Sequence, residues 1–224
     1  MTTVILIRHA HSIANEKGVL AGRALGIGLS KKGLEQAESL KQRLGSLKIN
    51  NLRISPLERC GLTIAPWVNQ NGISQNLIDV DQDVSEVDYG RWTGKKLSML
   101  ALKKEWRVVQ KTPSQMIFPE GESLLDVQRR AEKALLKSAK QARSGVAVIV
   151  SHGDVIKSLV ATALKLDLDN FQKIVIDPAS VTVLDFSKNE FRLLHLNDVS
   201  TNFEYLTKKS RPKGALIGGG AGRT

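Results

Sequence analysis

Short apolar segments rich in β-branched residues alternate with helical patterns along this chain, and that alternation constrains the fold most. The clearest strand patterns are TVILIR (3–8), LRIS (52–55) and VAVIVS (146–151), and each is followed by polar residues and then by a helical pattern. Strands that alternate with helices build a mainly parallel sheet covered by helices. The sequence therefore predicts an α/β fold, a three-layer sandwich with a mainly parallel central sheet and helices on both faces.

The remaining elements follow from local signals. Ser30 is a candidate N-cap for an amphipathic helix that runs to about Leu44. A second helix begins near Leu57, and Pro66 is expected to bend or end it. The other predicted elements are a strand over 76–80, a short helix near 97–109, a long amphipathic helix over 122–142, a helix from about Asp154, and a hairpin of strands 181–186 and 190–196.

The chain has 224 residues, which suits one α/β domain, expected over 1–204. Residues from about 91 to 120 are mixed in pattern and interrupt the alternation, so we expect them to form a lid insertion. Residues 205–224 are basic and glycine-rich, without a periodic apolar pattern, and are expected to be a disordered tail.

Composition narrows the class of protein. Cys60 is the only cysteine, so an internal disulfide is impossible, and no segment has the pattern of a signal peptide or a membrane span; a cytoplasmic setting is expected. The net charge is +11, but aromatic residues make up only 4% and no nucleic-acid-binding motif is present. We therefore expect no membrane or nucleic-acid partner, and oligomeric state stays open.

Polar clusters follow three of the predicted strands. Arg8 and His9 follow the first, Ser55 to Arg59 the second, and Ser151, His152 and Gly153 the strand VAVIV. Sites in parallel sheets gather beyond the carboxyl ends of strands, so these segments deliver two arginines and two histidines to one edge.

One reading of this edge is a metal site, because His9 and His11 have the spacing of a strand-end ligand pair. Arg8 would then add positive charge beside the metal, and the barrel hydrolases that use such pairs usually exceed this length. The metal reading is therefore disfavoured, and we expect no metal and no other cofactor.

The other reading is an anion site. Arg8 and Arg59 can hold phosphate oxygens with their planar forks, His152, if protonated, adds a third donor, and Asn15 can donate a further hydrogen bond. A neutral imidazole at His9 can then attack phosphorus, with the cations stabilising the charge on the equatorial oxygens.

A leaving alkoxide needs a proton, and Glu86 is the candidate acid, because it lies in the loop after the predicted strand 76–80. Asp81, Asp83 and Asp88 lie nearby, so a solvated acidic loop is the competing explanation. Taken singly, a surface Arg8 and a loop His152 are likewise the commoner cases, and only the shared arrangement after successive strands favours function.

These segments together resemble the histidine phosphatase superfamily, also called the phosphoglycerate mutase-like family. Arg8-His9-Ala10-His11-Ser12-x-x-Asn15 resembles its Arg-His-Gly-x-Thr-x-x-Asn signature, with alanine in place of the glycine. Further similar segments occur in the family's order: LSKKGLEQA (29–37), SPLERCGLT (55–63), SEVDYGRWTG (85–94), PEGES (119–123) and VSHG (150–153).

The resemblance implies roles for individual residues. His9 matches the phosphorylated histidine, Arg8, Arg59 and His152 the phosphate pocket, Asn15 an added phosphate contact, and Glu86 the proton donor. His11 falls at a variable position, where it can face the substrate. Ser12, Arg23 and Gly153 are weaker candidates for the substrate pocket, with Arg23 as a specificity residue.

The family includes phosphatases and mutases. The segment 21–30 lacks the Gly-Trp…Asp pattern of the glycolytic mutases, the sequence after Glu86 resembles the phosphatase form, and residues 95–119 contain no Arg-Arg pair. The resemblance thus favours a metal-independent phosphatase that hydrolyses a small phosphate monoester through a phosphohistidine. A phosphoglycerate mutase-type phosphomutase is the alternative, and a non-catalytic anion or nucleic-acid binder is a distant one.

Overall fold

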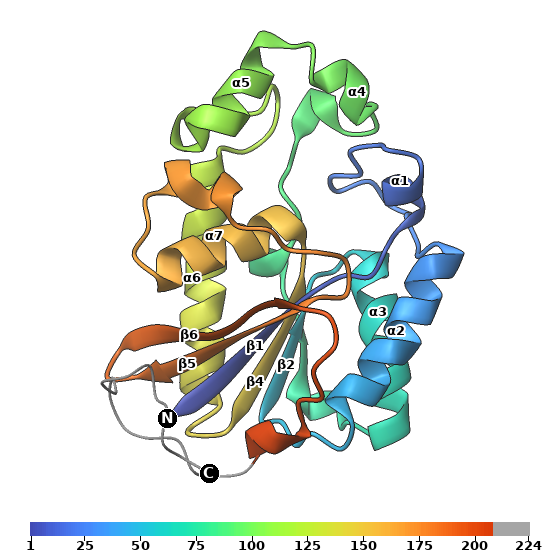
Figure 1. Ribbon diagram of the computed structural model, residues 1–224, viewed down its shortest axis with the longest axis vertical. Helices are drawn as coiled ribbons and strands as arrows, with labels where there is room; N and C mark the ends of the chain where they lie inside the picture. Colours follow the sequence, from blue (N-terminus) through green and yellow to red (C-terminus); the bar gives the residue numbers. More distant parts are fainter. Residues whose placement is uncertain (208–224) are drawn as a thin grey trace.

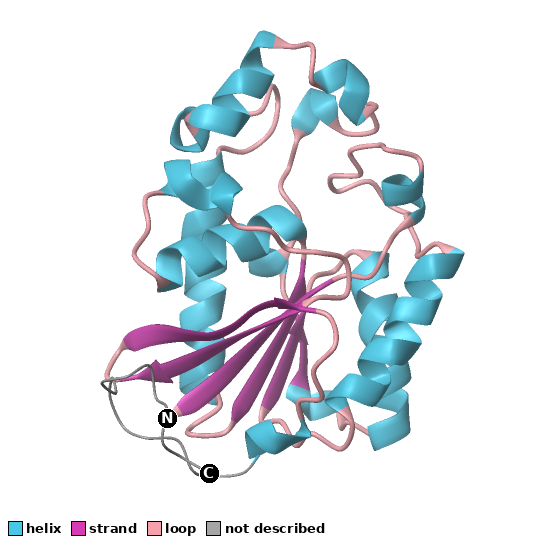
Figure 2. Cartoon of the chain, in the orientation of Figure 1, coloured by secondary structure: helices cyan, strands magenta, loops and turns pink. Residues whose placement is uncertain are grey.

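A six-stranded sheet forms the middle layer of the protein, whose computed structural model describes residues 1–207 (Figure 2). The strand order is β3-β2-β4-β1-β5-β6. The first four strands are parallel, and β5 and β6 are antiparallel to their neighbours, which confirms the mainly parallel sheet. The strands are β1 (Thr2–Arg8), β2 (Asn51–Ile54), β3 (Ile78–Val80), β4 (Val146–Ser151), β5 (Val181–Ser187) and β6 (Glu190–Asp198).

Helices cover both faces of the sheet, as the α/β pattern predicts (Figure 1). α2 (Lys31–Leu44) and α3 (Glu58–Asn71) lie on one face, and α6 (Leu124–Gln141) and α7 (Gly153–Ala163) lie on the other. Two short helices, α1 (Ile13–Glu16) and α4 (Leu97–Leu100), and α5 (Lys104–Lys111) lie toward the carboxyl ends of the parallel strands.

The strand β1 shows how the sequence builds two cores. Val4 and Leu6 join the cluster that contains α6 and α7, whereas Ile5 and Ile7 join the cluster that contains α2 and α3. Successive side chains of a strand point to opposite faces, so an unbroken apolar run is what a strand covered on both sides requires.

The ends of the helices follow their capping signals. The Ser30 side chain accepts a hydrogen bond from the Gly33 backbone N–H, which confirms the predicted N-cap of α2. Gly33 is itself required, because a Cβ there would lie 2.0 Å from the His11 carbonyl oxygen. The amino end of α2 therefore packs directly against the backbone that follows His9.

The structure differs from the predicted elements in four places. Of the two outcomes expected for Pro66, a bend or an end of the helix, the end does not occur: α3 continues to Asn71 with Trp67 fully buried, so packing outweighs the lost backbone hydrogen bond. Residues 75–77 form a 3-10 turn, which leaves only Ile78–Val80 as a strand. The single helix predicted near 97–109 is two helices, α4 and α5. The hairpin's second strand extends to Asp198.

The expected lid, residues 91–120, consists of α4, α5 and short 3-10 turns above the strand ends (Figure 1). Its first part is attached to the loop after α1: Leu20 donates to the Lys95 carbonyl at 2.9 Å and Gly94 donates to the Leu20 carbonyl at 2.8 Å. Trp92 stacks on Trp106 with the rings 6.2 Å apart. Whether this segment moves as a lid stays a prediction.

The boundary of the expected tail needs correction at its start. Residues Glu204–Thr207 form a 3-10 turn, and Leu206 is buried in the core beside α2 and α3. The rest of the expected tail, 208–224, lies outside the described residues. Within 1–207, no helix combines the length and apolarity that crossing a bilayer requires.

Candidate active site

The two histidines of the site come from neighbouring parallel strands that end at the same level. Arg8 pairs with Ser151 in the register of β1 and β4, and the His9 N–H donates to the Ser151 carbonyl at 2.9 Å. His9 and His152, the next residue on each strand, therefore lie side by side with ring centroids 5.2 Å apart. The sheet register alone brings these imidazoles together, as the sequence predicts.

The hydrogen bonding of the His9 ring leaves Nε2 as its unprotonated nitrogen. Its Nδ1 lies 2.7 Å from the Ala10 carbonyl oxygen, which can only accept, so Nδ1 carries the proton and Nε2 keeps a free lone pair. Burial, helped by the nearby Arg59 and Arg8, lowers the His9 pKa well below its ordinary value. The imidazole is consequently neutral at physiological pH, which a nucleophile requires.

Arg8 and Arg59 present hydrogen-bond donors that lack partners within the described chain. Arg8 donates one Nη1 bond to the Ile176 carbonyl, and Arg59 donates through Nη2 to the Gly22 carbonyl at 2.9 Å. Arg8 Nε and the Nε and Nη1 of Arg59 are buried and have no hydrogen-bond partner among residues 1–207. Buried guanidinium donors are rarely left unpaired, so these groups indicate a binding site for an anion.

His152 is buried between Ser55 and Arg59. Its Nε2 lies 2.7 Å from Ser55 Oγ, and its Nδ1 lies 3.2 Å from Arg59 Nη2, which can only donate. Nδ1 is thus the acceptor and Nε2 carries the proton in this arrangement. Burial and then the Arg59 charge lower the His152 pKa well below its ordinary value, so this arrangement does not supply the extra positive charge considered for this residue.

Glu86 lies opposite the histidines, in the segment between the 3-10 turns Gln82–Val84 and Gly90–Trp92. Its Oε2 is 3.6 Å from His152 Nδ1, and its Oε1 accepts from the Val87 N–H at 3.0 Å. Burial raises the Glu86 pKa to about 7, because desolvation outweighs the attraction of Arg59. The carboxyl is therefore not part of a solvated acidic loop, and near neutral pH it can exist in both protonation states.

Asn15 and Ser12 form a reciprocal cap on α1. Ser12 Oγ and the Ser12 backbone N–H both bond to Asn15 Oδ1, at 2.9 and 3.0 Å. With that oxygen occupied, the side chain of Asn15 lines the cleft with its amide N–H groups available, as the donor role requires. Ser12 also lines the cleft, but its hydroxyl is committed to the cap.

Of the weaker candidates for the substrate pocket, some line the cleft and others do not. Gly153 lines the cleft at the start of α7, where a Cβ would touch the Arg8 guanidinium at 3.4 Å. Arg23 is not among the lining residues; its guanidinium bonds to the Glu86 carbonyl and to Glu122. His11 does not line the cleft either, because its Nδ1 bonds to Ser30 Oγ at 2.9 Å.

The cleft has a volume of about 390 Å³, so it holds more than a phosphate group. Beyond Arg8, His9, Asn15, Arg59 and Glu86, it is lined by apolar side chains of the loop after α1 and of 174–176, and by the polar residues Lys157, Gln172, Asp154 and Asp177. Sequence reasoning missed Lys157. Its position four residues after Gly153, on the same face of α7, was a usable signal.

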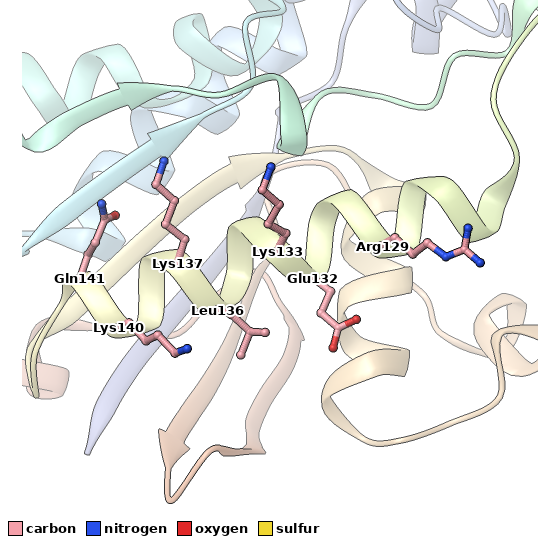
Figure 3. A pocket seen from close by; sticks show the side chains of 7 residues that line it. All are labelled: Arg129, Glu132, Lys133, Leu136, Lys137, Lys140 and Gln141. Carbon is pink, nitrogen blue, oxygen red and sulfur yellow. The ribbon is translucent and has the colours of Figure 1, made fainter.

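A larger hollow of about 600 Å³ lies on the outer face of α6 (Figure 3). It is lined by Arg129, Glu132, Lys133, Leu136, Lys137, Lys140 and Gln141. Lys133 and Lys137 pair with Asp83 and Asp79. None of these lining residues is buried and none is a Cys, Ser, Thr or His, so the hollow is a solvated helix face and not the candidate active site.

A metal ion has one set of possible ligands among the described residues. One ligand atom each of His9, Glu86 and His152 lies within 4.8 Å of the others. The same cluster lies in the field of the guanidinium groups of Arg8 and Arg59, whose positive charges oppose a cation. The donor set therefore fits an anion better than a metal ion. His11, the other member of the sequence pair, lies against Ser30 instead.

Comparison with known proteins agrees with this geometry. The sequence model of the histidine phosphatase superfamily (branch 1) matches residues 4–199. Phosphoserine phosphatase 1 of Hydrogenobacter thermophilus is 30% identical over 200 residues, which are 88% of this chain and 92% of that protein. A 2,3-bisphosphoglycerate-dependent phosphoglycerate mutase of Thermoplasma acidophilum is 28% identical over 204 residues, covering 89% and 94%. Among solved structures, Bacillus stearothermophilus YhfR superposes with a TM-score of 0.81 at 26% identity, covering 89% of this chain and 98% of that one.

Proposed function

The chain belongs to the histidine phosphatase superfamily, and we propose that it is a metal-independent phosphatase that hydrolyses a small phosphate monoester through a phosphohistidine at His9. The observation that carries the proposal is the set of unpaired buried donors on Arg8 and Arg59 beside a neutral His9. An anion that completes these hydrogen bonds would lie next to the free Nε2 lone pair.

In the first step, His9 Nε2 attacks phosphorus and the bond from phosphorus to the ester oxygen breaks. Arg8, Arg59 and Asn15 hold the equatorial oxygens, which carry the charge of the transition state. The leaving alkoxide takes the proton of Glu86, whose pKa of about 7 keeps a protonated fraction available near neutrality. The products of this step are phosphohistidine, the free alcohol and the Glu86 carboxylate.

In the second step, the same carboxylate takes a proton from water as the water oxygen attacks phosphorus. The bond between His9 and phosphorus breaks, and inorganic phosphate and the starting form of Glu86 result. Burial and Arg59 lower the His152 pKa, and the negative charge of a bound phosphate would raise it. His152 does not itself line the cleft. Once its Nδ1 is protonated, it can donate to the phosphate beside Arg59.

For the alcohol part of the substrate, we propose a small hydroxy acid whose carboxylate contacts Lys157. The relatives named phosphoserine phosphatase and phosphoglycerate mutase act on esters of this kind. Among the described residues that line the cleft, Lys157 is the cationic side chain other than Arg8 and Arg59. Its Nζ is held by Gln172 at 3.0 Å and lies 3.5 Å from Asp154, so it is preorganised one helical turn from Gly153.

A panel of phosphate esters, assayed with and without a chelator, tests the reaction class. We expect phosphate release that the chelator leaves intact, and strict dependence on an added divalent metal would contradict the proposal. Lys157→Gln should lower kcat/KM roughly tenfold for 3-phosphoglycerate and phosphoserine but little for glycerol 3-phosphate. Lys173→Gln, on a neighbouring exposed lysine outside the cleft, is the matched control. If Lys157→Gln lowers kcat/KM equally for all esters, the proposed contact between Lys157 and a substrate carboxylate is refuted.

A phosphomutase is the second candidate, because a mutase is among the relatives and shares the chemistry up to the phosphohistidine. The basic residues Lys95, Lys96, Lys103, Lys104 and Arg107 of the expected lid do not line the cleft, so they offer no second set of anion contacts there. Product analysis with a bisphosphate primer decides between the two. Isomerised monophosphate with little free phosphate would establish the mutase.

The proposed setting is the cytoplasm, since a chain with Cys60 as its single cysteine needs no oxidising compartment. We propose a small phosphorylated substrate as the partner and no nucleic acid. Salt-dependent binding to nucleic acid without turnover of any ester would support the distant alternative instead.

A further inference from the structure

Glu86 lies in a segment without sheet pairing, whose backbone must be held by other groups. We call residues 83–88 the acid segment. Its carbonyl groups at Asp83, Ser85 and Glu86 accept hydrogen bonds from one side chain, Arg130 of α6, at 3.0, 2.7 and 3.2 Å. Buried carbonyls need such partners, so Arg130 stands in for the missing neighbouring strand.

The other donors of Arg130 bind Glu122. Nε donates to Glu122 Oε2 at 3.0 Å and Nη2 donates to Oε1 at 2.7 Å, a bidentate pair. The five hydrogen bonds of Arg130 equal the number of N–H groups of a guanidinium, so it is fully occupied. Its side chain is 15% exposed, and neither Arg130 nor Glu122 lines the cleft.

Glu122 extends the same network to the other end of the acid segment. Its Oε1 accepts from the Asp88 N–H at 2.8 Å and from Arg23 at 2.9 Å, and Arg23 Nε also donates to the Glu86 carbonyl at 2.8 Å. The Glu122 N–H donates to the Asp88 carbonyl at 3.0 Å. The Glu86 carbonyl thus has two donors, both on guanidinium groups that share the Glu122 carboxylate.

Close backbone packing joins the acid segment to the turn before α6. A Cβ at Gly121 would lie 2.2 Å from the Asp88 carbonyl oxygen, and one at Gly90 would lie 2.1 Å from the Pro119 carbonyl oxygen. The acid segment is therefore fixed relative to α6 and, through α6, relative to the sheet that carries His9.

We propose that Arg130 and Glu122 are a positioning pair for the general acid: they fix the acid segment so that the Glu86 carboxyl faces the leaving group bound at His9. The inference rests on the proposed function of Glu86. Proton transfer needs heavy atoms within about 2.6–3.2 Å, and a displacement of about 1 Å can cost a hundredfold in rate. Loss of the pair should therefore damage acid catalysis specifically.

The choice of leaving group separates acid catalysis from every other role. An alkyl phosphate such as glycerol 3-phosphate releases a basic alkoxide that must be protonated, whereas p-nitrophenyl phosphate releases a stable phenolate. In Arg130→Met we expect kcat/KM for the alkyl ester to fall roughly a hundredfold, and at least tenfold more than for the aryl ester. Glu86→Gln should show the same split, by which we mean the larger loss of kcat/KM on the alkyl ester than on the aryl ester. Adding Arg130→Met to Glu86→Gln should enlarge this split by less than threefold.

Arg129→Met is the matched control. Arg129 is the exposed neighbour of Arg130, and it bonds to Asp126 of the same helix. We expect it to match the parent enzyme on both esters. Equal losses on both esters in folded Arg130→Met, or a loss on neither, would overturn the inference. If Arg130→Met does not fold, Arg130→Lys and Glu122→Gln carry the test, since each keeps part of the network and must show the split.

Failure of this inference differs from failure of the proposed function. If Glu86→Gln itself shows no split between the two esters, Glu86 is not the acid and the proposed mechanism fails. If Glu86→Gln shows it and the Arg130 and Glu122 variants do not, only the positioning pair is lost.

Discussion

Replacing Glu86 by glutamine should stabilise the protein at alkaline pH while abolishing its acid catalysis. The structure raises the Glu86 pKa from its ordinary value of 4.5 to about 7 through burial. Well below pH 4.5 the Glu86 carboxyl is protonated in both the folded and the unfolded chain, so its ionisation does not lower the free energy of unfolding. As pH rises to about 7, the unfolded chain loses its proton first, and the folded state becomes progressively less stable.

The magnitude follows from the size of the shift. A change from 4.5 to about 7 corresponds to about 3 kcal/mol of destabilisation, fully present above pH 7. Glutamine has no such charge, and its Oε1 can still accept from the Val87 N–H that bonds Glu86. We therefore expect Glu86→Gln to gain about 2–3 kcal/mol relative to the parent protein between pH 5 and pH 8.

Urea unfolding followed by tryptophan fluorescence measures this difference, since Trp67 and Trp92 are buried in the two cores. The buffers must lack phosphate, because an anion bound by Arg8 and Arg59 would stabilise the folded state. Glu35→Gln, which removes the same charge at an exposed site on α2, is the matched control. If parent and Glu86→Gln lose stability in parallel from pH 5 to 8, the Glu86 pKa is not raised and the argument for an acid near neutrality is refuted.

Three further outcomes follow from the site and its supports. Arg59→Met removes two unpaired buried donors and the bond to the Gly22 carbonyl, so kcat/KM should fall by roughly 10²–10⁴ for every ester, with inhibition by inorganic phosphate weakened alongside. Cys60 is buried and its pKa is raised to about 12, so mass spectrometry should find no alkylation by iodoacetamide at pH 8 until urea unfolds the chain; alkylation of the folded protein would contradict its placement. Gly90→Ala combines a φ of +50° with a clash at the Pro119 carbonyl and should lower the unfolding free energy by more than about 2 kcal/mol. Gly94→Ala, at φ +79° in open space, should lower it by about 1 kcal/mol. Equal losses in the two variants would refute the argument from close packing at Gly90.

The residues at strand ends could be predicted because parallel strands align their carboxyl ends. Arg8, His9 and His152 needed only the apolar runs before them and the rule that sites gather at that edge. The Ser30 cap was likewise local, since one side chain and one N–H three residues later define it. These features depend on short stretches of sequence, and for that reason sequence patterns reveal them.

Other features depend on contacts between distant segments and could not be predicted. Pro66 remains inside α3 because Ile64 and Trp67 on either side of it are buried in the core. Arg130 and Glu122 looked like ordinary charges of an amphipathic helix and its start, although they hold the acid segment. The burial of Glu86, which decides its chemistry, follows from that same tertiary packing.

The central claim is that phosphate passes through His9, and trapping the intermediate tests it most directly. The enzyme is mixed with a radiolabelled alkyl phosphate in the presence of chelator, quenched within milliseconds in denaturant at alkaline pH, and digested. We predict a label that is stable in base and lost in acid, on the peptide that contains His9, and absent from His9→Ala. Label that persists in His9→Ala, or turnover without any phosphorylated protein, would contradict the account.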